Sequence, residues 1–189
     1  RVQDNASAAV SARQLRELRR GAGQALGRKH ALYRALTAAL RALEEAARTE
    51  EFASGRLKSL PEALDAAMAQ LLEAAGEALA EGAGLPAADA FSMAAAWQCA
   101  AGRLDARYAV LTEGAEKTAR IEIFLLCAAQ DILEKTKRAR GTVFFSATLA
   151  PFEAAKRMLG SLDGDACLAL PSPFDKNQLD AKILPIDLR

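Results

Sequence analysis

The stretch LRELRRGAGQALGRKHALYRALTAALRAL, residues 15–43, decides the fold class. Its apolar residues recur at spacings of three, four and seven, which is the pattern of an amphipathic helix that buries one face. Alanine, the best helix former, makes up about a quarter of the chain, so helices are expected well beyond this stretch. Three glycines interrupt the pattern and leave a kinked helix and two consecutive helices equally open. The apolar positions are Leu15, Leu18, Ala22, Leu26, Tyr33, Leu36, Leu40 and Leu43.

Basic side chains gather on the opposite face of the same helical pattern. A charged helix face is most often simply solvated, and that interpretation stands beside a track for the phosphates of a nucleic acid. The net charge of +1 hides an uneven distribution of charge along the chain. Residues 1–48 carry ten basic side chains against four acidic ones, whereas residues 49–90 carry two against eight. At about 100° per residue, the face comprises Arg13, Arg16, Arg20, Gln24, Arg28, Arg34 and Arg41.

The segments that follow predict a mainly α chain with a partial α/β segment at its end. Helices are expected over residues 59–81, with Ser59 as N-cap, and from Asp89 or Ser92 to Ala101, with Trp97 in the core. Beyond residue 107, β-prone runs at 108–112, 120–127 and 142–145 alternate with helices at 129–138 and 151–159. Such alternation is typical of βαβ units and a parallel sheet.

Several classes of protein are excluded by composition. No apolar run approaches the ~18 residues of a membrane span, so we expect a soluble chain without a membrane partner. Cys99, Cys127 and Cys167 are too far apart for a metal site, and their odd number argues against a disulfide framework, which fits a cytoplasmic setting. The single histidine, His30, excludes a histidine-based zinc site. No catalytic residue and no metal ligand is therefore expected.

Small hydroxyl residues follow the last apolar run. Val143 to Phe145 would form a buried strand that places Ser146, Ala147 and Thr148 at the carboxyl end of a parallel sheet. Ligands bind at that edge in open α/β sheets, so these residues are candidates for contacting a phosphate, a metal-bound water or a neighbouring motif. The simpler interpretation is a strand-to-helix turn in which Ser146 or Thr148 caps the next helix.

The longer strings GTVFFSATLAPFEAAKRMLG, residues 141–160, and LPSPFD, residues 170–175, resemble the motif III region of the XPD/DinG-like family of superfamily two DNA helicases. RVQDNASA, residues 1–8, is similar to the stretch after the DEAH box of that family. The resemblance implies a helical arch-like domain over 1–104, the end of a first RecA-like motor domain over 105–150 and the start of a second over 151–189. It also implies a segment of an ATP-dependent 5′-to-3′ DNA helicase that acts in repair or replication-associated unwinding.

Site residues and partners follow from the same resemblance. Ser146, Ala147 and Thr148 would couple ATP hydrolysis to unwinding, and the arch would guide or gate single-stranded DNA. The implied partners are single-stranded DNA, the remainder of the motor and a regulatory protein. The alternative is a helical protein-interaction module without DNA contact, which an acidic ridge at Glu73, Glu77 and Glu81 supports. The expected DNA-binding residues are Arg13, Arg16, Arg20 and Arg28.

The chain also departs from that family. It contains no G-x-x-x-x-G-K-[ST] phosphate loop and no DEAH box, so we expect no ATP hydrolysis by this chain alone. ATP and Mg²⁺ would be bound by the parent enzyme. The four cysteines that hold an iron-sulfur cluster in many members lie before the DEAH box, which leaves the cluster content of the parent open.

Overall fold

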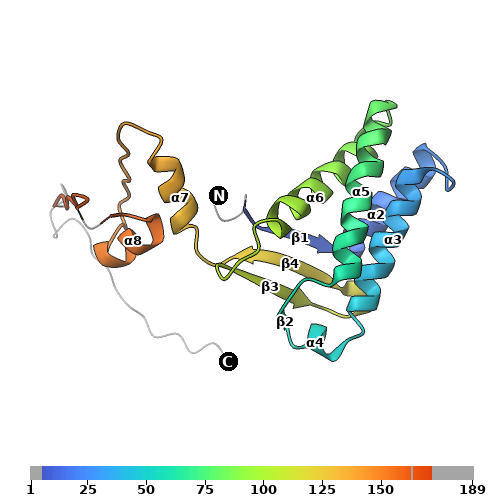
Figure 1. The fold of residues 1–189 in the computed structure, drawn as a ribbon, viewed down its shortest axis with the longest axis horizontal. Helices are drawn as coiled ribbons and strands as arrows, with labels where there is room; N and C mark the ends of the chain where they lie inside the picture. The colour runs from blue at the N-terminus through green and yellow to red at the C-terminus, as the bar shows by residue number, and fades with distance from the viewer. Residues whose placement is uncertain (1–5, 163, 172–189) are drawn as a thin grey trace, which may run out of the picture.

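The computed structural model describes residues 6–162 and 164–171. The chain is mostly helical and contains a four-stranded antiparallel sheet (Figure 1). Its main elements are β1 (Ala8–Ser11), α2 (Ala12–Ala25), α3 (Ala31–Ala46), α4 (Glu50–Ala53), β2 (Arg56–Leu57), α5 (Glu62–Ala80), α6 (Leu85–Ala101), β3 (Tyr108–Glu113), β4 (Arg120–Leu125), α7 (Ala129–Thr136) and α8 (Phe152–Leu159).

The amphipathic stretch forms two helices rather than one kinked helix. Ser11 caps α2, because its Oγ accepts a hydrogen bond from the Gln14 N–H at 3.2 Å. The turn between α2 and α3 contains Gly27 at φ +84°, a conformation that glycine adopts without steric cost. His30 then caps α3, since its Nδ1 accepts from the Leu32 N–H at 3.1 Å. Most predicted apolar positions are buried, and Leu18 and Leu26 are half-buried but pack against the core. Tyr33 is the exception, because it is half-buried and is not among the residues that pack against the core.

The next two helices exist as predicted, but both start elsewhere. Pro61 is extended at φ −63° and ψ 114°, and α5 begins after it without a side-chain cap. The residue before a proline avoids helical backbone, so Leu60 cannot continue a helix from Ser59, and the prediction of Ser59 as N-cap is wrong. Helix α6 begins at Leu85, ahead of Asp89, because Pro86 fits the first turn of a helix, where no N–H is needed.

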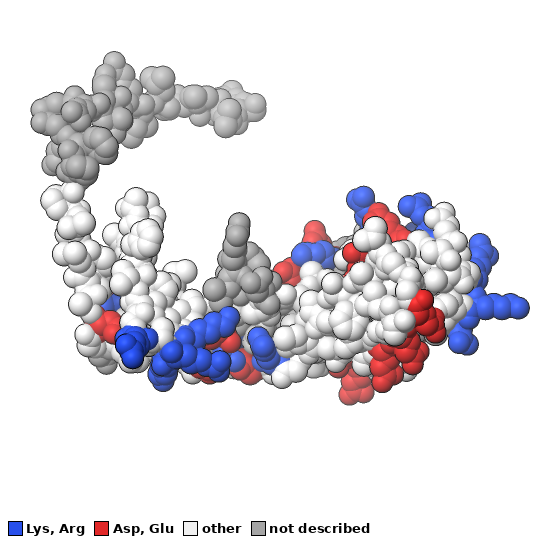
Figure 2. All heavy atoms as spheres, turned by 90° about the horizontal axis from the view of Figure 1, so that it is seen from above, with Lys and Arg blue, Asp and Glu red and all other residues white. Residues whose placement is uncertain are grey.

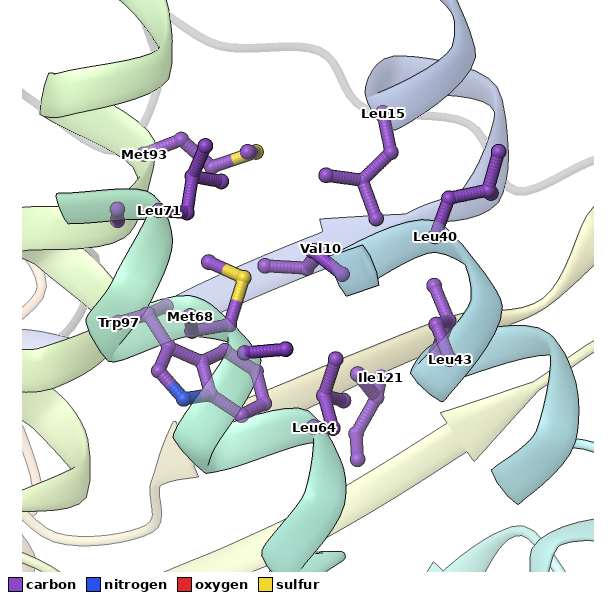
Figure 3. Packing of buried hydrophobic residues seen from close by; sticks show 14 of the residues in the cluster. Val10, Leu15, Leu40, Leu43, Leu64, Met68, Leu71, Met93, Trp97 and Ile121 are labelled. Carbon is purple, nitrogen blue, oxygen red and sulfur yellow. The ribbon is translucent and has the colours of Figure 1, made fainter. Parts of the chain in front are cut away.

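One hydrophobic core joins these helices to the sheet. Helix α5 packs against α3 and α6, α2 packs against α3, and both α2 and α6 contact β1. Figure 3 shows side chains from these elements meeting in the cluster, among them Val10, Trp97 and Ile121. Trp97 is fully buried as predicted. Its indole Nε1–H donates to Asp65 Oδ1 at 2.9 Å, so the one polar group of the side chain keeps a hydrogen-bond partner in the core.

The sheet has the strand order β1-β4-β3-β2, and every pair is antiparallel. The predicted parallel sheet is therefore wrong. Strands β3 and β4 are joined only by residues 114–119, which is too short for the crossover that a parallel pair requires. Val10 lies opposite Ile121, and Val110 lies opposite Ile123. The sheet thus joins β1 and β2, which lie in the predicted arch-like domain over 1–104, to β3 and β4, which follow it.

The part after β4 consists of α7 and α8, which pack against each other and confirm the two predicted helices. The predicted buried strand at 142–145 is wrong, because Val143 is 84% exposed and Phe145 is 91% exposed. A β-prone run needs a partner strand, and none of the described strands pairs with it. Gly160 ends α8 at φ +68° and lies so close to the Ala129 carbonyl that a Cβ would not fit.

Candidate nucleic-acid interface

An open groove of about 490 Å³ lies along α2 where it meets the start of α3. It brings together three of the four predicted DNA-binding arginines, Arg16, Arg20 and Arg28, and adds Arg19. Arg13 does not line it. The full lining is Arg16, Glu17, Arg19, Arg20, Gly23, Gln24, Arg28 and Tyr33.

Arg16 lines this groove and bonds to two neighbouring segments of the fold. Its Nη2 is 2.5 Å from Glu44 Oε1 on α3, and its Nη1 donates to the Lys117 carbonyl at 2.6 Å. About a third of the side chain is exposed, at 32%. Arg16 therefore cross-links α2, α3 and the connection between β3 and β4, which makes it a structural side chain whose charge is already compensated by Glu44.

The remaining arginines differ in their partners. Arg13 pairs with Glu17 one turn along α2, at 3.0 Å, and the arginine is 86% exposed, so solvent screens this pair. Arg19, Arg20 and Arg28 form no ion pair within residues 6–162 and 164–171. These three guanidinium groups carry the uncompensated positive charge of the groove, with Glu17 as the one acidic side chain of the lining.

Tyr33 closes one side of the groove by lying against the α2 backbone. A Cβ built on Gly23 would lie 3.0 Å from Tyr33 Cε2 and 3.2 Å from Cδ2. Glycine at this position therefore lets the ring edge approach the helix directly. The sequence pattern placed Tyr33 among the buried apolar positions. It did not include Arg19 in the basic face, although Arg19 follows Arg16 by three residues and so shares its face of α2.

Basic side chains lie at both ends of the molecule. Figure 2 shows Lys and Arg at the end that holds the α2–α3 turn and again toward the opposite end, with Asp and Glu on a face next to the first of these groups. Glu73 and Glu77 of α5 and Glu81, the C-cap of that helix, are exposed, so the predicted acidic ridge lies at the surface. Glu81 Oε2 is 3.2 Å from His30 Nε2, which connects the ridge to the start of α3.

The shifted pKa values lie outside the groove. Hydrogen bonds from the Arg107 side chain and backbone hold the pKa of Asp105 below its usual value. The Ser161 hydroxyl and the Leu162 N–H lower the pKa of Asp165 in the same way. Burial raises the pKa of Tyr108.

Ser146, Ala147 and Thr148 form an exposed turn at the opposite end of the molecule from the groove (Figure 1). The Thr148 N–H donates to Ser146 Oγ at 3.1 Å, and the two hydroxyl oxygens are 3.3 Å apart. Neither hydroxyl caps α8, whose N-cap is Pro151 without a side-chain hydrogen bond, so the capping interpretation is wrong.

Cys99, Cys127 and Cys167 are free and exposed, and the described residues contain no group of three or more side chains that could hold a metal ion. No helix in this part of the chain has the length and apolar character needed to cross a membrane. No family model matches the chain, and no curated protein matches it.

Proposed function

We propose that this chain is part of an ATP-dependent 5′-to-3′ DNA helicase of the XPD/DinG-like family and that the groove on α2 guides single-stranded DNA. The observation that carries the proposal is the convergence of Arg19, Arg20 and Arg28 without acidic partners in the described structure. The resemblance of residues 141–160 and 170–175 to the motif III region supports the choice of family.

Binding in this groove is electrostatic. Guanidinium groups contact backbone phosphates and release counterions, so affinity falls steeply with salt and does not depend on base sequence. Glu17, which pairs with Arg13, also lines the groove and lowers its positive potential, so a phosphate binds less tightly there than to the arginines alone. Arg16 contributes mainly by holding α2 and α3 in place.

The other assignments belong to the same proposal. Residues 105–150 and 151–189 contribute to RecA-like motor domains, in which Ser146, Ala147 and Thr148 couple the ATP site to the DNA site. The parent enzyme supplies the phosphate loop and the DEAH box that bind ATP and Mg²⁺, in a cytoplasmic setting. This chain alone does not hydrolyse ATP, because its sequence contains neither motif.

The second candidate is a protein-interaction module without DNA contact. The exposed acidic ridge of Glu73, Glu77 and Glu81 favours it, because three carboxylates on one helix face repel DNA and suit a basic regulatory protein.

Fluorescence anisotropy with labelled single-stranded DNA separates the two candidates. The double variant Arg20→Gln and Arg28→Gln loses two phosphate contacts, so the slope of log K against log salt decreases by about 1.4. The matched control is Arg34→Gln with Arg41→Gln, because these exposed arginines lie outside the groove lining and carry the same charge. Equal affinity of the groove variant and the wild type at every salt concentration supports the interaction module instead.

In the complete helicase, the groove variant should lose unwinding and keep DNA-stimulated ATP hydrolysis. That combination identifies a defect in strand guidance, whereas unaffected unwinding points to partner binding.

A further inference from the structure

We propose that the groove holds a nucleobase as well as a phosphate, with the Tyr33 ring as the surface on which one base of single-stranded DNA stacks. This inference rests on the proposed function and adds the kind of contact that the site makes. A track of arginines alone would recognise only the backbone.

The first support is the exposure of Tyr33. Its neighbours on α3, Leu32 and Leu36, are fully buried, whereas Tyr33 is half-buried and lines the groove. Its hydroxyl makes no hydrogen bond within residues 6–162 and 164–171. An aromatic side chain in this position offers apolar ring surface to the groove instead of contributing all of it to the core.

The second support is the fixed position of the ring. The edge formed by Cδ2 and Cε2 rests on the α2 backbone at Gly23, where any side chain would crowd it. Arg16 ties α2 to Glu44 of α3, which keeps the two helices at one spacing. A ring that is held before the ligand arrives loses little conformational entropy on stacking.

The third support is that the groove has both the volume and the positive charge that a nucleotide needs. The volume of about 490 Å³ lies within the ~300–1,000 Å³ of ordinary ligand sites. Arg20 and Arg28 line the same groove as Tyr33, so a phosphate and its base can be bound together. Proteins that bind single strands without sequence preference combine a cationic groove with an aromatic stacking surface in this way.

Two oligonucleotides test the inference on the full chain. One is a labelled oligothymidylate of about fifteen nucleotides, and the other is an abasic strand of the same length and charge. Because stacking adds to the phosphate contacts, the wild type should bind the oligothymidylate about fivefold or more tightly than the abasic strand. Tyr33→Leu should remove this preference, and Tyr33→Phe should keep it, since the ring face and not the hydroxyl makes the contact. Arg20→Gln is the control and should weaken both strands alike.

The outcomes separate the inference from the function on which it rests. If the wild type binds both strands equally and Arg20→Gln weakens both, base stacking on Tyr33 is refuted, whereas the binding of backbone phosphates by the groove arginines is supported. If neither strand binds, the proposed function itself fails. If Tyr33→Leu weakens both strands by the same factor while thermal melting is unchanged, Tyr33 acts by shaping the groove and stacking is again refuted.

Discussion

Residues 6–125 and residues 126–171 have similar apolar side chains but bury them very differently. Every buried residue of the described structure lies between Ala8 and Leu125, and none lies in residues 126–162 or 164–171. In the first region, helix faces with apolar residues at helical spacing meet one another and the sheet. In the second, α7 and α8 have eight residues each and pack mainly against each other. Burial thus requires a facing surface as well as an apolar sequence. The exposed large apolar residues of the second region are Leu126, Val143, Phe144, Phe145, Met158, Leu162, Leu168 and Leu170.

The largest expected effect tests this contrast with one aromatic side chain from each region. Trp97→Ala should lower the free energy of unfolding by about 3–5 kcal/mol, because it leaves a cavity and removes one of the hydrogen bonds to the Asp65 carboxylate. Phe145→Ala, in a side chain that is 91% exposed, should change it by no more than about 0.5 kcal/mol. Denaturant unfolding followed by circular dichroism measures both. A comparable loss in the two variants would show that Phe145 packs as a core residue.

A smaller effect separates the two kinds of arginine within the first region. Arg16→Gln should lower the free energy of unfolding by about 1–2 kcal/mol, since it breaks the bonds to Glu44 and to the Lys117 carbonyl. Arg20→Gln should leave stability within about 0.5 kcal/mol and reduce DNA binding instead. A double-mutant cycle with Glu44→Gln isolates the ion pair, and zero coupling would contradict a cross-link between α2 and α3.

Two glycines of α2 offer a matched pair with a still smaller effect. Gly21→Ala should raise stability by up to about 1 kcal/mol, because its Cβ would meet only the Pro86 ring, at ordinary contact distances of 3.7 and 3.8 Å, and alanine favours the helix. Gly23→Ala gains the same helix propensity but pushes on the Tyr33 ring, so its net gain should be smaller and its affinity for oligothymidylate lower. Thermal melts and anisotropy measure the two effects. Identical behaviour of the two variants would argue against contact between Gly23 and the ring.

The smallest effect reports whether the second region holds its local structure in solution. The pKa of Asp165 is lowered by the Ser161 hydroxyl and the Leu162 N–H, so these bonds stabilise the fold above the ordinary carboxyl pKa of about 3.9 and are lost as pH falls through the lowered value. Asp105, lowered by Arg107, is the reference from the first region. NMR titration should find both below the ordinary value, and Ser161→Ala should bring only Asp165 back toward it. An ordinary pKa for Asp165 in the wild type would show that the 161–165 turn does not persist.

The helices of the first region could be predicted from sequence because their signal is local. The spacing of Leu36, Leu40 and Leu43 identifies the buried face of α3 without knowledge of its partner. Strand direction has no such local signal, and the alternation of Ile121 and Ile123 suits either kind of sheet. Strand β1 was not predicted at all, because Ala8 and Ala9 favour a helix and only the distant β4 makes them a strand.

The groove was partly predictable for the same reason. Helical spacing placed Arg16 and Arg20 on one face of α2, and the pairing of Arg13 with Glu17 follows from a separation of four residues. The partner of Arg16, Glu44, belongs to the next helix and becomes its neighbour only once α2 and α3 have packed. Tyr33 has the apolar character of a stripe residue, and its place at the groove depends on the absence of a side chain at Gly23.

Gly160, at the end of α8, lies close to the carbonyl of Ala129, at the start of α7. Residues 137–151, which include Ser146 and Thr148, form a long loop that connects the other ends of these two helices. The entropy of closing such a loop grows only slowly with its length, so residues inserted near its tip should cost little stability. Changes in the length of the connection that carries the Ser-Ala-Thr turn should therefore leave the packing of α7 against α8 intact.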